Sequence, residues 1–358
     1  MPFMQLTLLY CLLIFFAGDQ ASENSSSAET KIVEPAKEAE DTNVILQSKD
    51  GGQTWQDISN GLPETEERVG LSAGASEIYL STEGGVTYRS KSNLRTPVWE
   101  KVNGIAPRSR IDFNPSGVIA YSYDGHIYRK KTSSDPGSYQ NWLPIYTSLI
   151  STSLKPHSVA TIFETSDGTV LLSTGKSLSR SVDKAQSWKL IQKVHVGEFV
   201  EAEGVLLAAG QKGIMRSTDN GEHWEWVISA GGGVGEHVER IDGGFAAISY
   251  NAKTKSRSIY ASFDTGKTWN RIDTGLPPSP NISSVKQIGS YLICGHPDGI
   301  FRSSDVGKTW VMVHGSVDNT MMASTKPLSI GSSKENPKVF DIYVSGNVVY
   351  AVAGSGGC

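Results

Sequence analysis

The feature that most constrains this chain is a short motif, S-x-D-x-G-x-T-W, which occurs several times along it. Intact copies lie at 48–55, 262–269 and 303–310. A copy with His in place of Thr lies at 217–224, and a weaker copy with Ala in place of Gly lies at 181–188. A motif that recurs at regular spacing indicates a repeat architecture, in which each copy belongs to one structural unit.

The residue types of the motif predict a β-hairpin. The apolar run before each serine alternates as a strand does, and Ser-x-Asp-x-Gly is typical of a turn. The carboxylate can accept hydrogen bonds from N–H groups inside the turn, glycine takes a left-handed backbone without steric cost, and tryptophan buries roughly 150–250 Å² on the return strand. We therefore predict that these residues build turns and do not act as acids or metal ligands: Asp50, Trp55, Asp183, Trp188, Asp219, Trp224, Asp264, Trp269, Asp305 and Trp310.

The motif resembles the Asp-box, or BNR, repeat of sialidases, sortilin-type receptors, xyloglucan hydrolases and the photosystem II assembly-factor propellers. The resemblance implies a β-propeller of the sialidase-like superfamily. It is specific for fold and nearly silent on function, because these families differ in everything else. The five segments above are called Asp-boxes from here on.

The spacing of the strand signals predicts seven blades of four antiparallel strands. Six units are complete, and two of these have decayed boxes that end at Trp99 and Trp142, so their last hairpins should be longer. The tail from Val339 to Val352 is the first half of a unit, and the stretch from Val44 to Trp55 is the second half. Pairing of these halves would close the ring and leave no open sheet edge. We predict an all-β fold, a seven-bladed β-propeller closed by its N- and C-terminal strands.

The ends of the chain suggest export. Residues 6–17 are almost wholly apolar, are too few to span a bilayer, and fit the central region of a secretory signal. We predict a signal peptide at 1–21, a disordered spacer at 22–42 that is polar and poor in aromatic residues, and the propeller at 43–358. The protein should be secreted or periplasmic, with no membrane insertion beyond the signal.

Composition excludes several function classes. The formal net charge is −4 and no basic block occurs, which argues against nucleic-acid binding. The three cysteines, Cys11, Cys294 and Cys358, form no disulfide framework; Cys294 should be a buried thiol, and a bridge to Cys358 is the alternative. The seven histidines show no metal-ligand spacing, and no glycine-rich phosphate loop occurs, so we expect no metal, no cofactor and a monomer.

The candidate binding site comes from the residues that precede the innermost strands. These are Arg68, Arg110, Ser158, His195, His237, Ser284 and Lys338. Five of the seven are basic or imidazole side chains. If they converge on the channel, they form a cationic funnel that suits a carboxylate, sulfate or phosphate group. Solvated loop residues that point outward are the alternative interpretation.

The function predicted from this set is a non-catalytic binding or scaffold propeller. It would recognise a protein or glycan with an acidic group through Arg68, Arg110, His195, His237 and Lys338. The photosystem II assembly-factor propellers are similar in length and act as non-catalytic scaffolds with a basic patch, so that resemblance implies the same type of role.

A sialidase-like glycoside hydrolase is the alternative function. The resemblance to sialidases implies an Arg-Ile-Pro strand, an arginine clamp, a tyrosine nucleophile activated by a glutamate, and an aspartate acid/base. Here Arg110 and Ile111 are followed by Asp112 in place of proline, and the count is seven blades where sialidases have six. The candidates are Asp124 as acid/base and Tyr250 with Glu239 as nucleophile pair; a tyrosine becomes nucleophilic only beside a carboxylate.

Overall fold

The computed structural model describes residues 44–59, 68–92, 94–132, 141–146, 159–229, 237–316 and 338–355. The predicted signal peptide and spacer, and Cys358, lie outside the described residues. The described part forms β-strands and turns, and none of it belongs to a helix with the length and hydrophobicity of a membrane span.

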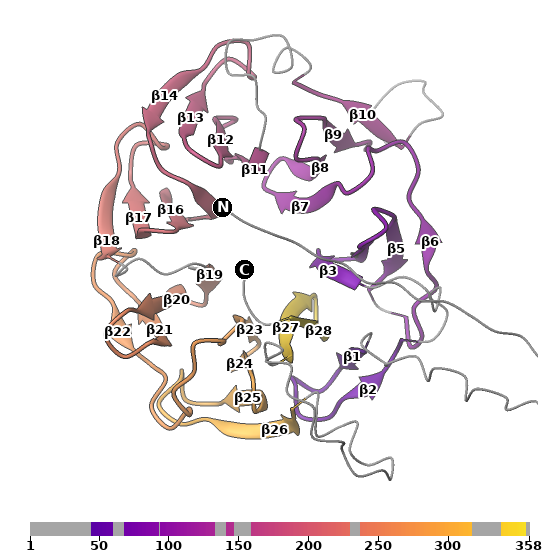
Figure 1. The fold of residues 1–358 in the computed structure, drawn as a ribbon, viewed down its shortest axis with the longest axis vertical. Helices are drawn as coiled ribbons and strands as arrows, with labels where there is room; N and C mark the ends of the chain where they lie inside the picture. The colour runs from indigo at the N-terminus through magenta and orange to yellow at the C-terminus, as the bar shows by residue number, and fades with distance from the viewer. Residues whose placement is uncertain are drawn as a thin grey trace, which may run out of the picture. The chain divides into compact units, whose positions relative to one another are not determined.

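The chain folds as a seven-bladed β-propeller, which confirms the predicted fold class (Figure 1). Each blade is a four-stranded antiparallel sheet. In blades 1 to 6 the strands follow chain order, and the first strand of each lies nearest the central channel (Figure 1). Successive side chains of a strand point to opposite faces of its sheet, and each face packs against a neighbouring blade. Both faces therefore need small or apolar residues.

The strand bounds are as follows. Blade 1 contains β3 (Arg68–Ala73), β4 (Glu77–Thr82), β5 (Thr87–Lys91) and β6 (Glu100–Lys101). Blade 2 contains β7 (Arg110–Asn114), β8 (Gly117–Tyr121), β9 (Ile127–Lys130) and β10 (Trp142–Pro144). Blade 3 contains β11 (Val159–Glu164), β12 (Val170–Thr174), β13 (Leu178–Ser181) and β14 (Lys189–Gln192). Blade 4 contains β15 (Val196–Ala202), β16 (Val205–Gly210), β17 (Gly213–Ser217) and β18 (Glu225–Ser229).

The remaining blades complete the ring. Blade 5 contains β19 (His237–Ile241), β20 (Gly244–Asn251), β21 (Ser256–Ser262) and β22 (Asn270–Arg271). Blade 6 contains β23 (Ser284–Ile288), β24 (Tyr291–His296), β25 (Gly299–Ser303) and β26 (Val311–Gly315). Blade 7 contains β27 (Lys338–Ser345) and β28 (Val348–Ser355), followed in space by β1 (Ile45–Ser48) and β2 (Gln56–Asp57).

Blade 7 confirms the predicted closure by the two chain ends. Its strand order is β27, β28, β1, β2, and β1 pairs antiparallel with β28 from Ile45 opposite Val352 to Ser48 opposite Val349. The N-terminal strand therefore sits inside a sheet whose other half comes from the end of the chain. No edge remains open between the last blade and the first.

The apolar core lies between the blades. One cluster joins Ile248 and Ile259 of blade 5 to Leu292, Cys294 and Trp310 of blade 6, and the other clusters likewise combine two neighbouring blades. Cys294 is fully buried and carries a free thiol, as the sequence predicts. Because neighbouring sheets share one core, each blade depends on its neighbours for burial.

The Asp-box turns are fixed by hydrogen bonds to serine and aspartate. In the copy at 303–310, Ser303 Oγ accepts a bond from Gly307 N at 2.8 Å and donates one to Asp305 at 2.8 Å. Asp305 also accepts bonds from the N–H of Thr309 at 2.8 Å and from its hydroxyl at 2.7 Å. Gly307 has φ of +82°, and a Cβ there would lie 2.4 Å from the carbonyl oxygen of Ile272 in blade 5, so glycine is required.

The two decayed boxes give longer hairpins, as predicted. The connection between the third and fourth strands spans 92–99 in blade 1 and 131–141 in blade 2, against 263–269 in an intact copy. Ser90 of blade 1 occupies the serine position of the motif and accepts a bond from Val98 N at 3.0 Å. Two residues later, where an Asp-box has its aspartate, this blade has Ser92.

Candidate functional site

The two faces of the ring differ in which turns they carry. The amide of Val159, where β11 begins, donates to the carbonyl of Tyr123, in the turn between β8 and β9, at 3.1 Å. The starts of innermost strands therefore share a face with the turns between second and third strands. We call this the funnel face.

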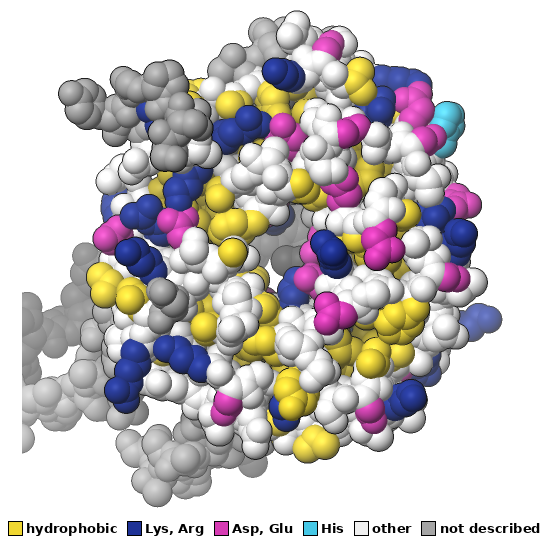
Figure 2. Space-filling view, turned by 180° about the vertical axis from the view of Figure 1, so that it is seen from behind, with side chains coloured by type: hydrophobic (Ala, Val, Ile, Leu, Met, Phe, Trp, Pro, Cys, Tyr) yellow, Lys and Arg dark blue, Asp and Glu magenta, His cyan; other side chains and the backbone are white. Residues whose placement is uncertain are grey.

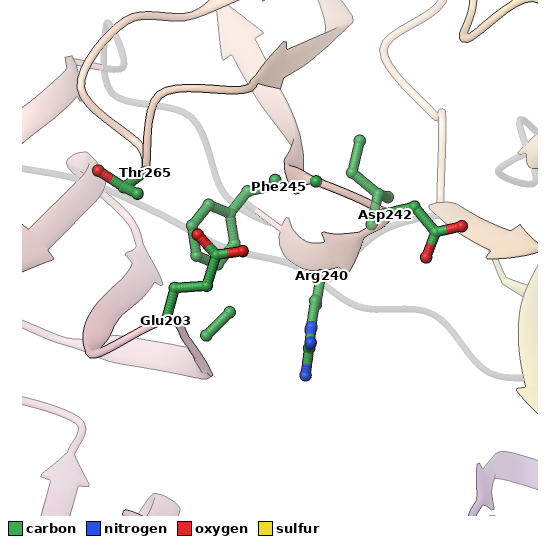
Figure 3. A pocket seen from close by; sticks show the side chains of 9 residues that line it. Glu203, Arg240, Asp242, Phe245 and Thr265 are labelled. Carbon is green, nitrogen blue, oxygen red and sulfur yellow. The ribbon is translucent and has the colours of Figure 1, made fainter.

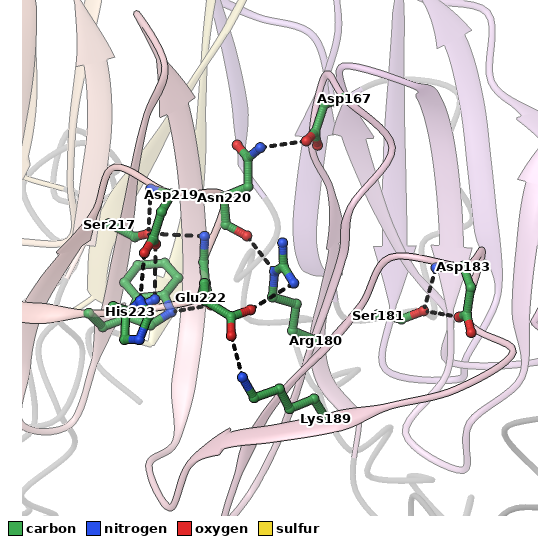
Figure 4. A network of polar contacts seen from close by, with 12 residues as sticks. Asp167, Arg180, Ser181, Asp183, Lys189, Ser217, Asp219, Asn220, Glu222 and His223 are labelled. Carbon is green, nitrogen blue, oxygen red and sulfur yellow. Dashed lines mark hydrogen bonds and ion pairs between the residues drawn. The ribbon is translucent and has the colours of Figure 1, made fainter.

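The opposite face carries the Asp-boxes and the turns between first and second strands, and we call it the Asp-box rim. Asn220, in the box of blade 4, donates from its side chain to Asp167, in the first turn of blade 3, at 2.5 Å (Figure 4). Arg180 of β13 donates to the carbonyl of Asn220 at 2.7 Å and to Glu222 at 2.9 Å (Figure 4). These contacts hold blades 3 and 4 together on this rim.

Three of the five predicted binding residues have described side chains. Arg110 is exposed where β7 begins, and its Nη1 lies 3.5 Å from the carbonyl oxygen of Ala160 in blade 3. Nδ1 of His195 lies 3.2 Å from the carbonyl oxygen of Thr174. His237 begins β19, and its ring lies 3.4 Å from Glu198 of blade 4.

The other two predicted residues, Arg68 and Lys338, begin β3 and β27. Their side chains lie outside what the structure describes. The topology places all five residues at or beside the funnel-face ends of innermost strands, and the assignment of a ligand to them stays a prediction.

The channel wall also holds charged residues outside the predicted acidic-group site, and one of them, Glu239, is a candidate of the alternative hydrolase prediction. Glu198 of β15 accepts a bond from the amide of Val238 at 3.1 Å. Lys286 of β23 forms an ion pair with Glu239 of β19, and Tyr121 donates to Asp112 of β7 at 2.7 Å. Figure 2 shows a hollow at the centre of one face, with both Lys/Arg and Asp/Glu side chains at its edge.

Part of this wall could have been found by strand periodicity. Asp112, Glu239 and Lys286 lie two residues after Arg110, His237 and Ser284, and side chains two apart lie on the same side of a strand. Glu198 escapes that rule because the register of β15 shifts between Val196 and Glu198.

Burial sets the protonation of the wall carboxylates. Burial raises the pKa of Asp112 to about 6, although Tyr121 and Arg110 act in the opposite direction. Burial also raises the pKa of Glu239, against the opposing effect of Lys286. For Glu198, burial acts to raise the pKa, but the hydrogen bond and charge of His237, the charge of Lys286 and the amide of Val238 together outweigh it, and the net shift is downward. The wall is therefore a set of ion pairs and half-buried carboxylates.

The three candidate hydrolase residues lie in two separate blades. Asp124 follows β8 in blade 2, where it accepts a bond from Ser122 and lies 3.2 Å from Nδ1 of His126. Glu239 and Tyr250 belong to blade 5, where Glu239 is opposite Ala246. Tyr250 lies four residues further along that strand, which corresponds to about 13 Å. Blades 3 and 4 separate Asp124 from the other two.

Within the described residues, no cluster of three His, Cys, Asp or Glu side chains could hold a metal ion. The fold and the channel wall together define a class: a seven-bladed propeller whose channel mouth is lined by charged side chains of both signs.

Comparisons with known proteins give likenesses of fold. The chain matches no protein-family model and no curated protein. YCF48 from Cyanidioschyzon merolae is 16% identical, with a TM-score of 0.49 and coverage of 70% of this chain and 85% of that chain. YCF48 bound to D1 peptide is 16% identical, with a TM-score of 0.48 and coverage of 70% and 83%. The computationally designed Ika8 protein is 8% identical, with a TM-score of 0.46 and coverage of 83% and 96%. At this level of similarity none of the three extends a function to this chain.

Proposed function

We propose that this protein is a secreted or periplasmic binding propeller that captures a partner protein or glycan by an acidic group at the mouth of its channel on the funnel face. The contact residues are Arg110 and His237, with His195, Arg68 and Lys338 around the same mouth. No chemical step is assigned to the site.

The observation that carries the proposal is the state of Arg110. Its side chain is exposed, and its one hydrogen bond within the described residues is the 3.5 Å contact to Ala160 O. A guanidinium has five N–H donors, so most of them remain available to a ligand carboxylate, sulfate or phosphate. Bidentate contacts of this kind are among the stronger hydrogen bonds in proteins.

The charged residues deeper in the channel limit how far such a group enters. Asp112 follows Arg110 by two residues, and Glu198 lies beside His237. Like charges repel, so an acidic group is held at the mouth and is not drawn along the channel. A mouth with positive groups outside and carboxylates further in fits an acidic group that projects from the surface of a larger partner.

A peptide-binding assay tests the proposal. We expect a fluorescein-labelled octaglutamate peptide to bind, with affinity that falls as salt is added, and the octaglutamine peptide to bind much more weakly. Arg110→Ala should weaken octaglutamate binding at least about tenfold, because it removes charge-assisted hydrogen bonds. Fluorescence anisotropy measures both.

Lys267→Ala is the matched control. It removes the same charge from an exposed side chain in the Asp-box of blade 5, on the opposite face. Binding should be unchanged. Equal binding by wild type and Arg110→Ala, or equal binding of both peptides by wild type, would show that the mouth does not recognise acidic groups.

A further inference from the structure

Two seams between blades carry a side-chain link on the Asp-box rim. In each of them the penultimate residue of an innermost strand contacts the first turn of the preceding blade. Glu201 of β15 accepts bonds from the amide and hydroxyl of Ser166 in blade 3, at 2.8 and 2.5 Å. Gln287 of β23 accepts a bond from Asp242 N at 2.6 Å and donates to its carboxylate at 3.1 Å.

The corresponding residues of blades 4 and 5 do not form this link. The penultimate residue of β19 is Arg240, and the first turn of blade 4 contributes Glu203. Both side chains are exposed, and neither makes a hydrogen bond or ion pair with another residue of the described part. A cavity of about 70 Å³ lies here, and Glu203 of blade 4 and Arg240 of blade 5 are among the residues that line it (Figure 3).

The walls of this cavity are held in place. Phe245 is 2% exposed and forms part of the lining. The carbonyl of Thr265, on another wall, accepts a bond from Nε of Arg216 at 2.7 Å. Asp242 is fixed by Gln287. The cavity is therefore largely pre-formed, as ligand sites usually are.

An exposed aromatic residue has its backbone next to the cavity. Phe263 is 56% exposed and lies two residues before Thr265 in the same Asp-box. A Cβ placed on Gly244, which lines the cavity, would come within 3.2 Å of the Cα of Phe263. An exposed ring beside a polar slot offers an apolar contact to a ligand that also forms hydrogen bonds.

The chemistry of the slot selects its ligand. Arginine only donates hydrogen bonds, and an ionised glutamate only accepts them. A hydroxyl group does both, so two neighbouring hydroxyls can accept from Arg240 and donate to Glu203. A water molecule occupies about 30 Å³, so the cavity has room for about two oxygen-sized groups. The opposite charges of Glu203 and Arg240 offset each other, so the slot favours a neutral ligand over an anion.

We propose that this slot on the Asp-box rim binds a neutral saccharide. Two adjacent ring hydroxyls bridge Glu203 and Arg240, and the C–H face of the sugar lies against Phe263. The site is separate from the acidic-group site on the funnel face, and it stands whether or not that proposal holds.

A printed array of neutral and acidic glycans tests the proposal, followed by isothermal titration calorimetry with the best neutral glycan. Wild type should retain neutral glycans. Arg240→Ala and Glu203→Ala should each lower the affinity at least about tenfold, and Phe263→Ala severalfold. All three side chains are exposed, so thermal unfolding of the variants should match wild type.

Two controls separate recognition from an indirect effect. Lys308→Ala, a charge change at an exposed residue in the Asp-box of blade 6, should bind as wild type does. The double exchange Glu203→Arg with Arg240→Glu keeps one donor and one acceptor across the slot and should recover much of the affinity lost in the single variants.

Three results would overturn the proposal. They are retention of no neutral glycan by wild type, unchanged affinity in Arg240→Ala, and unchanged affinity in Glu203→Ala. Retention of acidic glycans alone, lost in Arg110→Ala and kept in Arg240→Ala, would support the funnel-face site and exclude the slot.

Discussion

The carboxylate of an Asp-box and two carboxylates of the channel wall, Asp112 and Glu239, have pKa values that are shifted in opposite directions. The Thr309 hydroxyl and amide, with Ser303, lower the pKa of Asp305 to about 2, because hydrogen bonds favour the charged form. Burial raises the pKa of Asp112 to about 6, because the wall is poorly solvated.

The difference shows that exposure and hydrogen bonding, not residue type, decide what an aspartate does here. A box aspartate stabilises the fold when ionised, so its contribution exists above its ordinary pKa of 3.8 and is lost as the pH falls toward 2. Asp112 has a raised pKa, so the folded protein is favoured while this carboxyl is protonated. Its contribution to the free energy of unfolding is complete below pH 3.8 and is lost as the pH rises through about 6. The two regions respond to pH in opposite directions.

The largest effect expected on the box side comes from its tryptophan and not from its carboxylate. Trp310 is 9% exposed within the core that blades 5 and 6 share, and its Nε1 donates to Ile272 O at 2.8 Å. Trp310→Ala should lower the free energy of unfolding by about 3–5 kcal/mol. Urea unfolding measures this change.

Trp310→Phe serves as its matched variant. It keeps most of the apolar contact and loses the hydrogen bond, so the loss should be about 1 kcal/mol plus the smaller packing change. If both variants were equally unstable, the hydrogen bond and not the burial would be the main contribution.

On the channel side, Asp112→Asn should remove the part of the pH dependence of stability that Asp112 contributes. Asparagine keeps an acceptor for Tyr121 and carries no titrating charge, so the variant should be more stable than wild type at pH 8 by about 2 kcal/mol and close to it at pH 4. Urea unfolding at several pH values between 4 and 8 checks this. An Asp112→Asn profile parallel to that of wild type would contradict the assignment.

Tyr121→Phe sharpens the same test. It removes the 2.7 Å hydrogen bond that favours the charged form of Asp112, while the carboxyl stays among the same neighbours. The pKa of Asp112 should rise further, and the loss of stability with increasing pH should become larger.

The smallest effect is expected for the carboxylate of a box. Burial acts to raise the pKa of Asp50, but bonds from the hydroxyl and amide of Thr54, from Ser48 and from Gln53 bring it down to about 2. Asp50→Asn should cost less than about 1 kcal/mol at pH 7, because this exposed carboxylate is screened by solvent, and almost nothing at pH 2. Chemical unfolding at the two pH values gives the comparison; an equal cost at both would mean that charge plays no part.

Most of the fold could be predicted because its signals are local and repeated. A serine, an aspartate and a glycine at fixed spacing specify a turn, and strands with period two flank it, as the bonds of Ser303 and Asp305 show. Ring closure followed from two half-units, which the pairing of β1 with β28 confirms.

The channel wall could be predicted only in part because its contacts join different blades. Glu239 contacts Lys286, which lies 47 residues further along the chain, and Glu198 contacts His237 of the next blade. Which side chains face each other there depends on a register shift in β15 and on how the sheets pack. No local sequence pattern reveals the register shift or the packing of the sheets.

The split seventh blade has a consequence for how the protein is made. Its N-terminal strand leaves the ribosome about 300 residues before the strand beside which it finally lies. Until synthesis reaches the last strand, the nascent chain carries an unpaired β-edge, which is a template for aggregation. A chain that lacks β28 leaves β1 without its partner strand and keeps that edge exposed.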